Sequence, residues 1–173
     1  RGEKFSMKDI ENYSSLKDFF SDSKKIKCKS IILSGEPVPN MQFIVESLIK
    51  VKTPLPIVIV TNGYYSRSTA DIIEKLADVV IFDFIFHDPV CASYIGKAEN
   101  YADVIKRNIL LAKKHSDIII RIPIIPGHIE CDAKMILSWI KRSIELPNIE
   151  LLKDYTNASE LSEFAEVSRK PSI

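Results

Sequence analysis

The stretch IILSGEP, at residues 31–37, determines how we expect this chain to fold. It opens with β-branched and leucyl side chains, which are typical of a strand inside a parallel sheet. Ser34 and Gly35 come next, where the backbone can turn sharply or approach a ligand closely, and Glu36 then adds a carboxylate. Because ligands of α/β sheets bind at the carboxyl ends of the strands, this loop is a candidate binding loop. The alternative is an ordinary strand-to-helix turn with an exposed glutamate.

The composition is that of an ordinary globular protein. The chain has 173 residues, of which 46% are hydrophobic and 27% charged, and we expect one domain over residues 1–173. The formal net charge of +1 does not indicate a nucleic-acid partner, and no apolar run approaches the roughly 20 residues that cross a bilayer. We therefore expect a cytoplasmic protein without nucleic-acid or membrane partners. Because the sequence begins with Arg1 rather than Met, we also expect residues upstream of it.

Apolar runs and helical patterns alternate along the rest of the chain. Strands are predicted near 30–33, 57–60, 79–84, 118–123 and 149–152, and helices near 6–20, 41–50, 66–76, 101–115, 131–143 and from 159. The run at 57–60 is apolar throughout, which is typical of a strand covered on both faces. The segment 85–100 is too long for a tight turn and predicts a short helix or a functional loop. The order predicts an α/β fold, a partial (β/α) barrel with a parallel sheet of about five strands alternating with helices.

Polar residues gather at the predicted carboxyl ends of the strands. They are Ser34, Gly35, Glu36, Thr61, Asn62, Asp83, Arg121 and, after the last strand, Tyr155. The set suits a zwitterionic or polyhydroxylated small molecule, because Glu36 could accept from an ammonium, Arg121 could clamp a carboxylate and Asp83 could bind a ribose hydroxyl. The alternative is that Asp83 and Arg121, both within apolar strands, pair with each other as a structural ion pair.

The cysteines and histidines do not predict a protein metal site. The cysteines are odd in number and widely spaced, which indicates reduced thiols rather than a disulfide framework or a CxxC motif: Cys28, Cys91 and Cys131. Cys131 could still be reactive, because it follows His128 and is predicted to open a helix. His128 itself could be an acid, a base, a ligand or simply an exposed loop residue. His87 and His115 have no partners at ligand spacing, so we expect no metal ligands among them.

Four segments together resemble the radical S-adenosylmethionine enzymes, especially the branch similar to pyruvate formate-lyase activating enzyme. Residues 32–37 resemble that family's Gly-Gly-Glu-Pro motif, with Ser34 in place of the first glycine. Residues 61–64 resemble its Thr-Asn-Gly turn, residues 77–84 its Ala-Asp…Asp-Phe-Lys strand, and residues 120–128 its Ile-Arg…Pro-Gly-His run. Each motif is weak alone, but their order and spacing make the set specific.

The resemblance implies a cofactor site and an activity. Ser34, Gly35 and Glu36 would hold the methionyl ammonium of S-adenosylmethionine, with Asp83 and Arg121 on the ribose and carboxylate side, and Thr61 and Asn62 beside them. The intact enzyme would generate a 5′-deoxyadenosyl radical, which abstracts hydrogen from a partner protein or a small molecule. The resemblance does not assign catalytic residues in this sequence.

Two departures from the family bear on that activity. The Cys-x3-Cys-x2-Cys motif that binds the family's [4Fe–4S] cluster is absent, so a cluster requires an N-terminal segment that this sequence lacks. Ile85 also stands where the family has a lysine that contacts the cofactor. We therefore expect the chain alone to be inactive. The alternatives are a degenerate, cluster-less paralogue acting as a binding or scaffolding module, and an unrelated α/β domain that binds a nucleotide or metabolite.

Overall fold

Five parallel strands form a single sheet whose spatial order follows the sequence. The computed structural model describes residues 29–34, 55–145 and 147–153. The strands, in the order β1-β2-β3-β4-β5, are β1 (Ile31–Leu33), β2 (Ile57–Thr61), β3 (Val79–Asp83), β4 (Asp117–Pro123) and β5 (Asn148–Leu152). This confirms the predicted α/β fold and its five parallel strands. The helices predicted near 6–20, 41–50 and from 159 lie outside the described residues.

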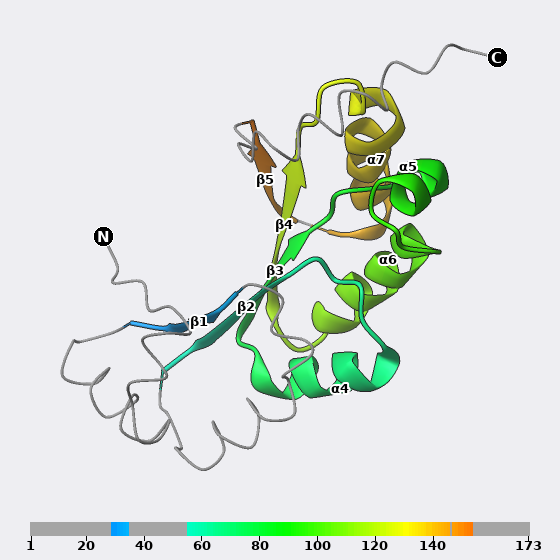
Figure 1. The fold of residues 1–173 in the computed structure, drawn as a ribbon. Coiled ribbons are helices and arrows are strands. Elements are labelled where there is room, and N and C mark those ends of the chain that lie inside the picture. Colours follow the sequence, from blue (N-terminus) through cyan, green and yellow to red (C-terminus); the bar gives the residue numbers. More distant parts are fainter. Residues whose placement is uncertain (1–28, 35–54, 146, 154–173) are drawn as a thin grey trace, which may run out of the picture.

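The described helices lie on one side of this sheet, as Figure 1 shows. They are α4 (Arg67–Leu76), α5 (Pro89–Tyr94), α6 (Tyr101–Ala112), the π-helical turn η2 (Ile129–Ala133) and α7 (Lys134–Ser143). Each right-handed crossover advances by one strand in the same direction, which places the connecting helices on the same face. The segment 85–100 contains the short helix α5, which was one of the two alternatives predicted for it. No helix in the described ranges is long and apolar enough to cross a membrane.

Burial alternates along the strands. In β2, the side chains of Ile57, Ile59 and Thr61 are buried beneath the helices, whereas those between them are half-buried. In β3, Val80 and Phe82 are buried and the residues between them are again half-buried. All the described helices cover the face of β2 that carries the buried side chains, so the prediction that the 57–60 strand is covered on both faces stays a prediction.

Two polar side chains of α6 brace the loops that leave the strands. The buried Tyr101 hydroxyl lies 3.2 Å from the Asn62 carbonyl and 3.0 Å from the Asp83 carbonyl, at the ends of β2 and β3. The fully buried Asn108 amide donates to the carbonyls of Gly63 (2.8 Å) and Tyr65 (3.0 Å). Buried carbonyls need such partners, so α6 holds the turn after β2 in one conformation.

Replacement of Asn108 by alanine tests this bracing. The substitution removes one of the two donors to each of the Gly63 and Tyr65 carbonyls, which keep the Tyr65 N–H and Arg107 Nη2, and it opens a small cavity, so the free energy of unfolding should fall by about 2 kcal/mol. Urea denaturation followed by circular dichroism measures the change. Leu110→Ala on the same helix is the control, since Leu110 is exposed and its truncation should cost less than about 1 kcal/mol. Equal losses in the two variants would contradict the bracing role.

Candidate functional site

The structure places the described members of the predicted strand-edge site at the carboxyl ends of neighbouring strands. Ser34 directly follows β1, Thr61 ends β2 and Asp83 ends β3. Arg121 in β4 is the register partner of Asp83. Because the strands are parallel, these residues share one edge of the sheet. Gly35, Glu36 and Tyr155 lie outside the described residues.

Asp83 and Arg121 form a two-pronged ion pair. Arg121 Nε donates to Asp83 Oδ1 at 2.6 Å, and Arg121 Nη2 donates to Asp83 Oδ2 at 2.7 Å. The side chains remain 30% and 26% exposed, so the pair is open to solvent and to a ligand. Glu150 of β5 is the register partner of Arg121 on its other side, so Arg121 lies between two acidic positions of the neighbouring strands. Asp83 and Arg121 therefore pair with each other, as the alternative prediction stated. Both side chains nevertheless remain partly exposed.

The side chains of Thr61 and Asn62 accept hydrogen bonds from backbone N–H groups of the turn that follows β2. The Thr61 side chain is only 1% exposed, and its hydroxyl accepts from the Gly63 N–H at 3.1 Å. The Asn62 carboxamide accepts from the Tyr64 N–H at 2.8 Å. Thr61 is thus buried on the helix-covered face, opposite Phe82 in the register, whereas Asp83 lies on the other face. The structure therefore does not bring the Thr61 side chain together with Asp83 and Arg121.

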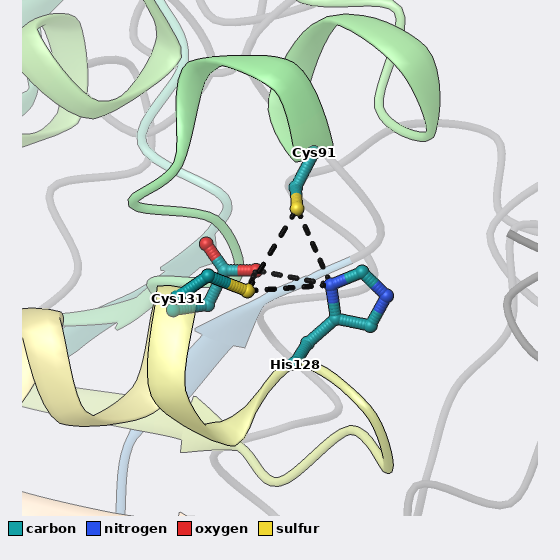
Figure 2. A group of neighbouring side chains, drawn as sticks. Cys91, His128 and Cys131 are labelled. Atoms are coloured by element: carbon teal, nitrogen blue, oxygen red, sulfur yellow. Dashed lines mark hydrogen bonds and ion pairs between the residues drawn. The ribbon is translucent and has the colours of Figure 1, made fainter. Parts of the chain in front are cut away.

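A second group of polar side chains converges just beyond this edge. Cys91 projects from α5 toward His128 and Cys131, which come from the segment after β4, as Figure 2 shows. Asp132 completes the group, and one ligand atom from each of the four residues lies within 4.8 Å of the others. We call these four residues the Cys/His/Asp tetrad. His128 and Asp132 are buried, and the two free cysteines are half-buried.

Local sequence explains why three members of the tetrad share a face. Gly127 has φ +86°, a left-handed conformation that suits glycine, and the His128 N–H donates to the Ile125 carbonyl across this turn. The predicted Pro-Gly turn is therefore confirmed. The helix η2 follows immediately, and positions three and four apart lie on the same side of a helical turn. This periodicity brings Cys131 and Asp132 next to His128.

Asp132 joins this turn to the start of α5. Its Oδ1 accepts from the backbone N–H groups of His87 (2.6 Å) and Asp88 (2.8 Å). The Asp88 carboxylate in turn accepts from the N–H groups of Val90 (2.7 Å) and Cys91 (3.0 Å) and so caps α5. These contacts fix the position of Cys91 relative to η2. They also direct the second oxygen of Asp132, Oδ2, toward the tetrad.

The contacts within the tetrad are short. Nδ1 of His128 lies 3.3 Å from Cys91 Sγ, 3.7 Å from Cys131 Sγ and 3.4 Å from Asp132 Oδ2. The two sulfurs are 3.9 Å apart, and Cys131 Sγ lies 3.6 Å from Asp132 Oδ2. Nε2 of His128 is buried and has no hydrogen-bond partner among the described residues. His128 is therefore not an exposed loop residue, which was one of the alternatives for it.

Burial and the nearby carboxylate disfavour ionised thiols in the chain by itself. Burial raises the pKa of the Cys91 thiol well above its ordinary value, and the charges of Asp132 and Cys131 add to the increase. Burial also raises the pKa of Cys131, with Asp132 again contributing. Cys131 therefore lacks the lowered pKa expected of a reactive thiol at the start of a helix. A cation at the centre of the tetrad would reverse this preference, because it stabilises thiolates directly.

The tetrad was not predictable as a set from residue spacing alone. No metal site was predicted, because His87 and His115 have no partners at short spacing and the cysteines are widely spaced, whereas Cys91 lies on the separate helix α5. The available signal was His128-x2-Cys131-Asp132 at the start of a predicted helix, a spacing that puts all three side chains on one face. Cys91, on α5 after β3, could be predicted to join these three residues only once β3 and β4 are known to be neighbours.

Comparisons with known proteins support the fold. No protein-family model matches the sequence. A protein of Methanocaldococcus jannaschii, described as uncharacterized, is 27% identical over 138 residues, covering 80% of this chain but only 40% of that protein. The chain thus spans less than half the length of this relative. A crystal structure of a domain of pyruvate-formate lyase-activating enzyme from Bacteroides vulgatus matches with a TM-score of 0.59 and 17% identity, over 80% of this chain and 96% of that one. The chain therefore has an α/β fold similar to that of a domain of a pyruvate-formate lyase-activating enzyme.

Proposed function

We propose that this chain is the S-adenosylmethionine-binding part of a radical-enzyme core of the activating type. The Asp83–Arg121 pair carries the proposal, because it presents a carboxylate and a guanidinium at the carboxyl edge of the sheet while both remain partly exposed. S-adenosylmethionine offers an amino-acid carboxylate and ribose hydroxyls, which these two groups recognise. The fold, similar to a domain of such an enzyme, supports the same assignment.

Asp83 orients Arg121 in this proposal. Two of its contacts hold the guanidinium nitrogens Nε and Nη2, which fixes the plane of the arginine at the sheet edge. A guanidinium held in this way can meet a planar carboxylate with less loss of side-chain entropy than a freely rotating one. Ser34, Gly35 and Glu36, from the loop after β1, would complete the site at the ammonium end of the ligand.

The described residues do not fit the iron–sulfur cluster that intact radical enzymes of this type require. A [4Fe–4S] cluster is held by several cysteine thiolates, whereas the two cysteines in the described ranges converge with a histidine and an aspartate around one point. We therefore assign cofactor binding to this chain and no step of radical formation. The same observation favours a second candidate, a cluster-less module that binds the nucleotide without cleaving it.

Calorimetric titration with S-adenosylmethionine tests the proposed site. We expect saturable binding at one site per chain, and Arg121→Gln should weaken it at least tenfold, about 1.4 kcal/mol. The pair is partly exposed, so this variant should lose only about 1 kcal/mol of folding stability and remain folded. Arg142→Gln, at an exposed position on α7, is the matched control and should bind like the unmodified chain. Absence of saturable binding, or equal affinity in both variants, would contradict the proposal.

Reconstitution with iron and sulfide under anaerobic conditions tests the cluster assignment. Because the sequence holds only three cysteines, none at the Cys-x3-Cys-x2-Cys spacing, we expect no acid-labile sulfide to remain bound after desalting. Colorimetric sulfide analysis and visible absorption spectra provide the measurement. A stable complement of bound sulfide would show that this chain alone carries a cluster, and the assignment above would then be wrong.

A further inference from the structure

We propose that Cys91, His128, Cys131 and Asp132 bind one zinc-type divalent cation that joins the loops after β3 and β4. This inference does not depend on the proposed S-adenosylmethionine site. It rests on the separations of the four ligand atoms, on their chemistry, and on the contacts that hold them in place.

Five of the six separations between the ligand atoms match a tetrahedron around a single ion, and the sixth, between Cys91 Sγ and the Asp132 carboxylate, lies within 4.8 Å. Zinc lies about 2.3 Å from sulfur and about 2.0–2.2 Å from nitrogen or oxygen, so tetrahedral angles require S···S near ~3.8 Å and S···N or S···O near ~3.6 Å, with N···O near ~3.4 Å. The sulfurs of Cys91 and Cys131 are 3.9 Å apart. The sulfur-to-nitrogen contacts are 3.3 and 3.7 Å, and the sulfur-to-oxygen contact is 3.6 Å. The nitrogen-to-oxygen contact is 3.4 Å. Five edges therefore agree with a zinc tetrahedron to within about 0.3 Å.

The donor types select the kind of metal. Two thiolates and one imidazole are soft or borderline ligands, which exclude Mg²⁺ and Ca²⁺ as preferred occupants and favour zinc. An iron–sulfur cluster is typically held by four cysteine thiolates, whereas this group offers only two thiolates, which lie close together, and two donors that are not sulfur. Four protein ligands fill the coordination shell of a tetrahedral ion, which is typical of structural rather than catalytic zinc sites.

The carboxylate is already positioned for this role. Asp132 uses Oδ1 to accept the backbone N–H groups of His87 and Asp88, and it turns Oδ2 toward the histidine and Cys131. Such outer contacts orient the ligands of metal sites. Asp88, which caps α5, fixes Cys91 on the opposite side. The ion would thus connect α5 to η2 directly beyond the strand ends that carry Asp83 and Arg121.

The test uses the purified chain, stripped of metal under reducing conditions and titrated with Co²⁺ as a spectroscopic probe. We expect one Co²⁺ per chain, with near-ultraviolet thiolate charge-transfer bands and the intense visible bands of a tetrahedral ion, and displacement of Co²⁺ by Zn²⁺. His128→Gln should weaken binding at least tenfold, whereas His115→Gln, at a 56% exposed histidine outside the tetrad, should not. Cys91→Ser keeps the test decisive if the buried His128 variant does not fold, since Cys91 is only half-buried. Cys28→Ser should retain full binding.

Several outcomes would overturn the proposal. They are substoichiometric metal, the weak visible spectrum of an octahedral ion, or an unchanged spectrum in Cys91→Ser. A Cys91–Cys131 disulfide in the protein as isolated, detected as the loss of two hydrogens by intact mass, would also overturn it. None of these results bears on S-adenosylmethionine binding, which is measured separately by calorimetry.

Thermal unfolding provides an independent readout of the same site. An ion that binds the folded chain and joins two loops should raise Tm by several degrees, and a strong chelator should reverse the increase. Cys91→Ser should show neither change, whereas His115→Gln should show both. An identical Tm with and without one equivalent of Zn²⁺ in the unmodified chain would contradict the proposal.

Discussion

The parallel register of β3 against β4 is the constraint on which both polar sites depend. It pairs Asp83 with Arg121 directly, and the Phe84 N–H extends the ladder by donating to the Arg121 carbonyl at 3.0 Å. A slip by one residue would turn one partner toward the helix-covered face, because successive side chains of a strand point to opposite faces. The same slip would shift the loop bearing Cys91 against the loop bearing His128. One backbone alignment therefore sets the geometry of the ion pair and of the tetrad.

Helix α6 supports this alignment from behind the sheet. Tyr101, at its first turn, lies against the carbonyls that end β2 and β3, and Asn108, two turns later, holds the turn after β2. Gly63 in that turn has φ +73°, and a Cβ there would lie 2.6 Å from Ile105 of the same helix. The close approach of backbone to helix requires glycine at this position. The strand ends are thus held by buried, satisfied polar groups, which favour one arrangement over many.

The elements were predictable from the sequence because apolar runs and helical periodicity are local signals. Strands near 57–60 and 118–123 and the helix near 101–115 match β2, β4 and α6 to within a few residues. Asp83 and Arg121 stood out as charges within apolar strands, and the register pairs them. The tetrad was missed because its members converge only through the tertiary neighbourhood of two loops, Cys91 on one and His128 on the other. The face of β2 on which the described helices lie was not predictable either, since an apolar run does not reveal on which side the helices pack.

The two sites differ in how their charges are balanced, and this difference predicts different responses to the ligands proposed for them. Asp83 and Arg121 neutralise each other and remain partly in water, so their pairing needs no further partner for stability. The tetrad places three acidic groups and one imidazole around a largely buried point, and none of its members carries a permanent positive charge. Such a group must either keep its thiols protonated or enclose a cation. Metal loss would therefore loosen the junction of α5 and η2 by local opening, while the sheet and its strand-edge pair would stay folded.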